Sequence, residues 1–343
     1  METNEEYDID NAWSSYMGGD LESTFDNMDI NNNININISS NNVPKGTDIY
    51  ISTKTKIGYL SESIDLLSVF WCIDITPYHL HKDGVIKKQM KFNFTDQNSV
   101  DEIQEKIIGI KNVDQYIIQQ IINPSGRIKF KDIRKISIGL SNKDITSYRT
   151  KKKSAFYNCF VIIMRVKMEN DYKEVHVKVF NTGKLEIPGI RCDKLLEKVM
   201  VLLVNILKPL INSDTLYYDS SKCETVLINS NFNCGFYINR NKLLDILKFK
   251  YNIDCIFDAC QYPGIQCKYE YNLVNKEKYK VSFMIFRTGS VLIVGKCDEE
   301  ALNYIYQYIK QILIDEYHEI NVKNLEVNKI VSKKKIKKKT IFI

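Results

Sequence analysis

Two alternating stretches of hydrophobic and polar residues give this chain its clearest pattern. Residues 174–180 (EVHVKVF) and 280–286 (KVSFMIF) place apolar side chains at every second position, which predicts two β-strands. Each runs into the motif F-x-T-G-x-[LV]-x-I-x-G, at 180–189 and 286–295. Thr-Gly at this point is typical of a hairpin turn. Each copy therefore predicts a strand, a turn and a second strand.

An amphipathic helix is predicted after each hairpin. The helices begin near Asp193 and Asp298 and carry apolar residues at i, i+3, i+4 and i+7, the stripe of a helix that covers a sheet. A strand pattern and a short helical pattern precede both hairpins, at 47–70 and 223–250. Self-similarity at a fixed offset indicates a duplicated unit. We predict two copies, each reading strand, helix, three strands and long helix, related by pseudo-twofold symmetry.

The segments outside this domain differ from it in composition. Residues 1–47 are acidic and rich in asparagine, with no apolar period, which predicts a disordered arm. Residues 326–343 are a basic tail. The predicted domain spans residues 48–325, with repeat one at 48–212 and repeat two at 223–318.

Repeat one contains an insertion at about 78–153 that has no counterpart in repeat two. A helix is predicted at 100–122, ended by Asn-Pro-Ser-Gly. A segment rich in lysine and arginine follows it.

Strand alternation also assigns the two faces of the predicted sheet. Val175, Val177 and Val179 lie on one side, and the helices should cover that side. The other face carries apolar and aromatic side chains beside basic ones: Phe180, Phe286, Met284, Leu292 and Val294, with His176, Lys178 and Lys280. An open face of this kind predicts a binding surface. The alternative is that the insertion packs on it.

Charge is unevenly distributed along the 343 residues. The chain carries +6, but residues 1–47 hold nine acids and one base, about −8, which leaves about +14 for the rest. A basic body favours a polyanionic partner, although solubility alone would also explain it. We expect no membrane span, because there is no run of 18 apolar residues, and the acidic N-terminus does not resemble a signal peptide.

The residues that carry catalytic chemistry form no pattern. Nine cysteines show no C-x-x-C spacing, so we expect buried thiols in a reducing, intracellular compartment rather than a zinc site. The four histidines have no catalytic spacing, and there is no P-loop, G-x-S-x-G or H-E-x-x-H motif. We therefore expect no enzyme activity, no metal and no cofactor.

Four short motifs occur in a fixed order. Three lie in repeat two, at 228–234 (INSNFNC), 261–268 (QYPGIQCK) and 284–295 (MIFRTGSVLIVG), and one in repeat one, at 161–165 (VIIMR). They resemble, in turn, the first strand, the Phe-Pro-Gly strand, the central hairpin and the Val-Ile-Met-Arg strand of the TATA-box-binding protein family, in a divergent form similar to those of large DNA viruses. The resemblance covers about residues 48–318, apart from the insertion.

This resemblance implies an α+β saddle, in which two β-α-β-β-β-α repeats form a curved antiparallel sheet backed by helices. The concave face of such a saddle enters the DNA minor groove, where apolar wedges kink the duplex. The implied protein is a transcription initiation factor that binds and bends A·T-rich promoter DNA. Its implied partners are double-stranded DNA, RNA polymerase and general transcription factors. Its implied location is the nucleus, a cytoplasmic viral factory or the virion.

Carried over residue by residue, the resemblance assigns three roles. The wedges fall on Phe180, Phe286 and Tyr262. The groove contacts fall on Asn229, Asn231, Asn233, Met284, Leu292 and Val294. The phosphate contacts fall on Arg165, Lys184, Arg191, Lys268 and Lys178.

Repeat one departs from the family pattern at four positions: Tyr50, Cys159, Glu186 and Pro188. Cys159 falls on the fourth wedge, for which Tyr157 or Phe160 could substitute if the register slips. A carboxylate is unfavourable on a surface meant for DNA. These departures favour a second hypothesis, in which the fold is a protein-interaction module of a transcription complex and does not bend DNA.

A second alignment of repeat one places the Phe-Pro-Gly strand at Gly84–Met90. It would move the insertion to after residue 94 and put Lys88 on the phosphate contact. We favour the alignment with Arg165, because it keeps the strands adjacent and matches repeat two.

Overall fold

The computed structural model describes residues 43–146, 158–169, 171–272 and 278–322. They form two compact units. The large unit consists of residues 54–225, and the small unit consists of residues 43–53 and 226–322. The predicted basic tail, and all but the last residues of the predicted acidic arm, lie outside the described residues.

The large unit is an antiparallel sheet in the order β3-β4-β2-β5-β6-β7-β1. Its strands are β1 (Tyr50–Leu60), β2 (Gly84–Phe94), β3 (Val113–Ile122), β4 (Phe130–Gly139), β5 (Cys159–Met168), β6 (Asp171–Phe180) and β7 (Lys184–Ile190). Its helices are α3 (Leu66–Cys72), α4 (Gln97–Ile107), α5 (Asn142–Thr146) and α6 (Asp193–Ile211).

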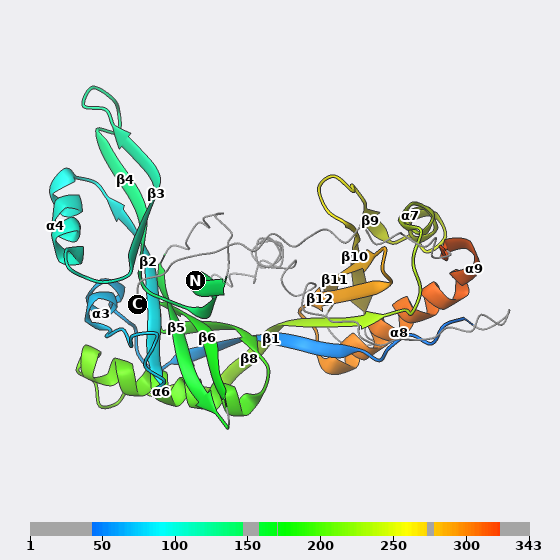
Figure 1. The fold of residues 1–343 in the computed structure, drawn as a ribbon, viewed down its shortest axis with the longest axis horizontal. Coiled ribbons are helices and arrows are strands. Elements are labelled where there is room, and N and C mark those ends of the chain that lie inside the picture. The colour runs from blue at the N-terminus through cyan, green and yellow to red at the C-terminus, as the bar shows by residue number, and fades with distance from the viewer. Residues whose placement is uncertain (1–42, 147–157, 170, 273–277, 323–343) are drawn as a thin grey trace. The chain divides into compact units, whose positions relative to one another are not determined.

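Helix α6 runs along one face of β5 and β6 (Figure 1). It buries a stripe that includes Leu196, Val199 and Leu203 in the same core as Val177 and Val179 of β6. The helix ends at Asn212, which adopts the left-handed conformation (φ 52°) common after a helix C-terminus. Burial of this apolar stripe therefore positions the opposite face of β6 and β7, where the site residues are predicted.

The small unit repeats this arrangement in the order β8-β12-β11-β10-β9, again antiparallel. Its elements are β8 (Tyr218–Asn233), α7 (Arg240–Phe249), β9 (Asp254–Ile256), β10 (Gly264–Asn272), β11 (Lys278–Phe286), β12 (Ser290–Gly295), α8 (Glu299–Asp315) and α9 (Tyr317–Ile320). β8 and β1 contribute residues to both units. Helix α8 begins after the cap Asp298, whose carboxylate accepts the N–H of Ala301 at 2.7 Å.

The predicted strands and buried face are confirmed in each unit. Val281, Phe283 and Ile285 are buried in one core with α8, as Val175, Val177 and Val179 are with α6. An antiparallel sheet with helices agrees with the expected α+β class. The strand order β1-β7-β6-β5 of the large unit matches β8-β12-β11-β10 of the small unit. The pseudo-twofold saddle itself stays a prediction.

The helix predicted at 100–122 is wrong in its second half. α4 ends at Ile107, and Val113–Ile122 is strand β3, which pairs with β4. Gly109 (φ 82°) and Asn112 (φ 57°) break the helix, since both take positive backbone angles that end helices. The isoleucine-rich segment that follows is then free to pair as a hairpin, and β-branched residues favour strands.

The insertion extends the sheet of the large unit. Its α4 residues Val100 and Ile103 share a core with Phe92 and Phe94 of β2, so α4 packs on the helix-covered face. α5, at the end of the described insertion, instead contacts Glu174, which alternates with Val175 on β6 and so lies on the opposite face. For α5, the alternative that the insertion packs on that face is therefore correct. In the large unit β2 pairs beside β5. It takes the position that β9 has beside β10 in the small unit.

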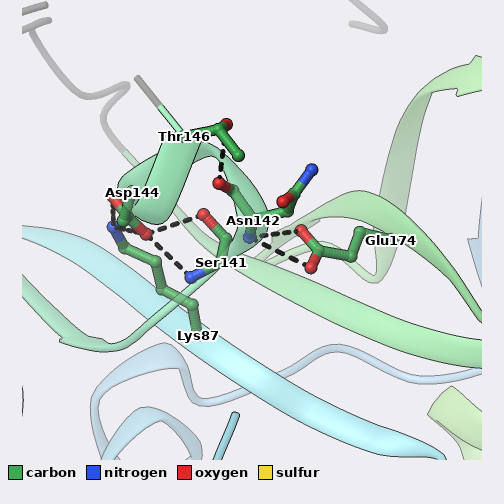
Figure 2. Close-up of polar contacts among 6 residues, drawn as sticks. All are labelled: Lys87, Ser141, Asn142, Asp144, Thr146 and Glu174. Carbon is green, nitrogen blue, oxygen red and sulfur yellow. Dashed lines mark hydrogen bonds and ion pairs between the residues drawn. The ribbon is translucent and has the colours of Figure 1, made fainter. Parts of the chain in front are cut away.

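Short polar contacts attach α5 to the sheet, as Figure 2 shows. Asp144 accepts hydrogen bonds from Lys87 Nζ at 2.7 and 2.8 Å and from the Ser141 hydroxyl at 2.6 Å. The backbone N–H of Asn142 donates to the carboxylate of Glu174 on β6 at 3.0 Å. Burial raises the pKa of Glu174. These contacts fix the end of the insertion against β2 and β6.

The alternative alignment of repeat one is wrong. β2, which contains Gly84–Met90, pairs with β5 and β4 and not with β6. Lys88 is buried on the helix side, where its ammonium donates to the carbonyl of Ile73 at 2.7 Å. It therefore cannot contact a phosphate. The strand with Val161–Arg165 lies beside β6, as the favoured alignment predicts.

Candidate nucleic-acid interface

Tyr262 and Phe286 meet at one end of the small unit's sheet. Their ring centroids are 5.9 Å apart and the ring planes are inclined at 62°, an edge-to-face geometry that aromatic pairs favour. Gly264 lies opposite Phe286 on the neighbouring strand. A Cβ atom at Gly264 would lie 3.1 Å from Phe286 Cε1 and 3.2 Å from Tyr262 Cε1. The absence of a side chain at Gly264 makes room for the pair, and the structure thus brings together two of the three predicted wedges.

Met284, Leu292 and Val294 continue from this pair along the same face. Leu292 lies opposite Met284 and Val294 opposite Ser282. Met284 and Leu292 form a small cluster with Phe286 and the partly buried Tyr262, separate from the helix-side core. The prediction of an open face is wrong at these positions, because Met284 is 0%, Leu292 7% and Val294 1% exposed. Met284 and Leu292 pack there with Phe286.

Two of the three predicted groove asparagines are held by β1. Asn229 Nδ2 donates to the Thr53 hydroxyl at 3.1 Å, and Asn231 Nδ2 donates to the Ser52 hydroxyl at 2.7 Å. Asn229 is 6% exposed, and its Oδ1 has no hydrogen-bond partner among the described residues. The hydroxyls fix both amides on the face that carries Leu292 and Val294. The sequence analysis did not predict that Ser52 and Thr53 position these asparagines. The signal that could have indicated it is a pair of small polar residues inside a strand pattern.

Asn233 has a different role. Its Nδ2 donates to Ser290 Oγ at 3.2 Å, and its Oδ1 accepts the N–H of Gly235 at 2.7 Å. These contacts stabilise the turn after β8. The assignment of Asn233 to a groove contact stays a prediction, but its amide already serves this turn.

The third wedge, Phe180, lies at the end of β6 and is half-buried. Lys184 Nζ lies 6.0 Å from the centre of its ring. Cys159 lies directly opposite Phe180, as Gly264 lies opposite Phe286. Cys159 therefore occupies the place of Gly264 and not that of Tyr262.

The register of strand pairing thus corrects the fourth wedge. The position equivalent to Tyr262 is two residues before Cys159 and falls on Tyr157, which lies outside the described residues. Phe160, the other substitute, is fully buried in the core. Burial raises the pKa of the Cys159 thiol to about 11, so this side chain is neutral at physiological pH.

Lys178 and Glu186 form an ion pair across β6 and β7. Lys178 Nζ donates to Glu186 Oε1 at 2.6 Å, and each side chain is 15% exposed. The residues lie opposite each other in the ladder. The carboxylate that departs from the family pattern therefore neutralises a lysine that the sequence assigned to a phosphate.

Arg165 also cannot serve as the predicted phosphate contact. It is 4% exposed and donates to the carbonyl oxygens of Tyr78, at 2.7 Å, and of Leu80. Its guanidinium lies 5.3 Å from the ring centre of Tyr78 and 5.7 Å from that of Tyr172. The cation is used to hold the start of the insertion.

The remaining assignments place side chains at the surface. Arg191 and Lys268 are exposed, and Lys184 and Pro188 are half-buried. Tyr50, at the position of a family asparagine, is 60% exposed. The phosphate roles of Arg191, Lys268 and Lys184 stay predictions. Among the helices of the described residues, none has the length and apolar character to cross a membrane.

Fold and site define an α+β protein whose antiparallel sheet carries helices on one face and, on the other, aromatic, aliphatic and asparagine side chains in register. No protein-family model matches the chain. It is 27% identical over 213 residues to a TATA-box-binding protein-like protein of Acanthamoeba polyphaga mimivirus. The match covers 55% of this chain and 57% of that protein. The resemblance to the TATA-box-binding protein family is thus confirmed, in a divergent form.

Among solved structures, the chain aligns with the TBP of Methanococcus jannaschii. The alignment covers 79% of this chain and 99% of that one, at 14% identity and a TM-score of 0.37.

Proposed function

We propose that this chain is a TATA-box-binding protein-like transcription initiation factor that binds duplex DNA in the minor groove and bends it. The observation that carries the proposal is the Tyr262–Phe286 pair at the end of the small unit's sheet, with Asn229 and Asn231 held on the same face. Aromatic side chains that enter a base step kink the duplex. Asparagine amides can meet the acceptors that A·T pairs present in the minor groove.

Burial of the apolar cluster sets a condition on this proposal. Because Met284 and Leu292 are buried in this structure, DNA binding requires the cluster to open. The apolar side chains would then exchange contacts with one another for contacts with sugars and base edges. Unstacking a step costs about a few kcal/mol, which the contacts to a widened groove offset.

A second function is favoured by the large unit. Few positive charges remain on the face of this unit that would contact DNA. Arg165 is buried, Cys159 is neutral, and Lys178 is paired with Glu186. The second candidate is therefore a protein-interaction module of a transcription complex that does not bend DNA.

Energy transfer between dyes at the two ends of a duplex with an A·T-rich centre tests the proposal. Wild type should shorten the distance between the ends. The double variant Y262A/F286A should bind without shortening it. Phe249→Ala is the matched control, because Phe249 lies on α7 with 84% of its surface exposed, and it should bend DNA as wild type does. If wild type leaves the distance unchanged at low and high salt, the second function is the correct one.

We further propose that RNA polymerase and general transcription factors are the protein partners, in the nucleus, a cytoplasmic viral factory or the virion. Affinity purification of the tagged chain from its own cellular setting should recover polymerase subunits. Recovery of other proteins alone would contradict this part of the proposal.

A further inference from the structure

Two arginines lie beside the Tyr262–Phe286 pair. Arg287 follows Phe286 directly, and its carbonyl oxygen accepts the N–H of Ile238 at 2.9 Å. Ile238 is two residues before Arg240, the first residue of α7. The guanidinium of Arg240 in turn donates to the carbonyl oxygen of Pro263, the residue after Tyr262. Backbone and side-chain contacts therefore bring both arginines to the same end of the sheet as the aromatic pair.

Arg240 is held in place by two contacts. Besides its hydrogen bond to Pro263, its guanidinium lies 4.6 Å from the ring centre of Phe257, a cation–π contact. One nitrogen is engaged by the carbonyl oxygen, which leaves donors of the planar guanidinium for another acceptor. A guanidinium that is already fixed loses little side-chain entropy on binding.

The two positive charges are not compensated by carboxylates. Within the described part of the chain, neither Arg240 nor Arg287 forms an ion pair with an acidic side chain. Burial and the nearby charge of Arg287 lower the pKa of Arg240. Two like charges at the same end of the sheet repel each other, and an anion bound by both would offset that repulsion.

We propose that Arg240 and Arg287 form a phosphate clamp that holds a phosphodiester group of the duplex next to the base step entered by Tyr262 and Phe286. Guanidinium groups bind phosphate oxygens through paired N–H donors. The proposal rests on the DNA-binding function proposed above and adds two residues to which the resemblance to the family assigns no role. The clamp would hold the duplex beside the kinked step and so help to direct the bend.

The salt dependence of DNA binding tests the clamp. Fluorescence anisotropy of an A·T-rich duplex, measured from about 50 to 200 mM salt, gives the slope of log K against log salt. The magnitude of this slope decreases by about 0.9 for each phosphate that the protein no longer neutralises. R287Q should lower the slope by about that amount and weaken binding several-fold. R240Q should do the same. K242Q is the control, since Lys242 is exposed on the same helix and should leave the slope unchanged.

Neutralising single phosphates locates the contact. Methylphosphonate placed at each linkage in turn should weaken wild-type binding most at one position beside the kinked step. R287Q should be insensitive at that position and sensitive elsewhere. Arg287 is exposed, so its variant should fold even if R240Q disturbs the Pro263 loop.

Two results would overturn the clamp and can be told apart. If wild type binds and bends the duplex but R287Q keeps the wild-type slope and the same methylphosphonate profile, the clamp is wrong and the proposed function is unaffected. If wild type does not bind duplex DNA, both the clamp and the proposed function are wrong.

Discussion

Lys178 donates to the carboxylate of Glu186 at 2.6 Å from the neighbouring strand. This relationship explains how a carboxylate is tolerated on the face that we propose contacts DNA. The pair is satisfied within the sheet, so the negative charge meets a cation in place of a phosphate. As a result, neither side chain is available to a polyanion.

Replacing Glu186 with glutamine should strengthen DNA binding by the large unit's face. Removing the carboxylate leaves Lys178 with one negative partner fewer, so the slope of log K against log salt should steepen by about 0.9. Unfolding free energy should fall by no more than about 1 kcal/mol, the usual worth of a cross-strand charge pair. Anisotropy titrations and urea unfolding measure the two effects. Asp193→Asn is the control, because Asp193 pairs with Lys56 at 3.5 Å but is 82% exposed; an equal gain there would show a general charge effect.

Substitution of Gly264 by alanine should displace the Tyr262 and Phe286 rings from their present contact by a few tenths of an ångström. The new Cβ would lie 3.1 and 3.2 Å from the two rings, so the rings must shift, at a cost of about 1–3 kcal/mol for an overpacked site. DNA bending should decrease while salt-dependent binding remains. End-to-end energy transfer and thermal unfolding of the same sample test this. Wild-type bending in the G264A variant would mean that the contact between the rings is not needed.

Lys88 should make stability depend on pH in an unusual direction. Burial lowers its pKa from 10.5 to about 8, so between these values the unfolded chain binds more protons than the folded one. Unfolding free energy should therefore rise with pH over this window, by about 3 kcal/mol at 1.4 kcal/mol for each pKa unit. The neutral amine still donates to the carbonyl of Ile73, 2.7 Å away.

The variant Lys88→Met isolates this effect. The difference in unfolding free energy between wild type and K88M, measured in urea at pH 7.5 and pH 10, should move in favour of wild type as the pH rises. Taking the difference cancels the other titrating groups. Lys248→Met, at an exposed lysine of α7, should show a constant difference. A constant difference for K88M as well would contradict the prediction.

Asp132→Asn should destabilise the β3–β4 hairpin strongly. Arg134 donates to the Asp132 carboxylate at 2.7 and 2.5 Å, and Asp132 is 0% exposed. Gln120 of β3 donates to the same carboxylate at 3.0 Å. Removing one partner of a buried pair typically costs about 3–5 kcal/mol. Urea unfolding of D132N measures this decrease in stability. The double variant D132L/R134M should recover most of it, since no charge is then left buried without a partner.

Period-two alternation predicted the strands around Phe180 and Phe286 and their buried faces, because that spacing is a local property of the chain. The segment 113–122 (VDQYIIQQII) was wrongly predicted as helix because its apolar spacing suits either structure. The pairing partner that decides for a strand, β4, lies further along the chain. Only the long-range pairing of this segment with β4 distinguishes a strand from a helix here.

The sequence identified candidate site residues by residue type and motif. It could not show which groups their side chains contact in the fold. Arg165 has the residue type of a phosphate contact, yet its guanidinium turns to the carbonyl oxygens of Tyr78 and Leu80, up to 87 residues away. The two-residue shift at Cys159 has the same origin, since register is set by backbone pairing. Tyr262, Phe286 and Asn229 could be proposed as site residues because the motifs of repeat two resemble those of the family, and their DNA contacts stay predictions.

The described residues of the large unit's insertion share their core with the rest of that unit. Phe92, Val100 and Ile136 belong to the same packed cluster as Phe70 of α3 and Leu203 of α6. Heat or denaturant cannot release this segment without dissolving that shared interior, so we expect one cooperative melting transition for the whole unit. The segment that the sequence presents as an insertion therefore contributes to the stability of the whole large unit.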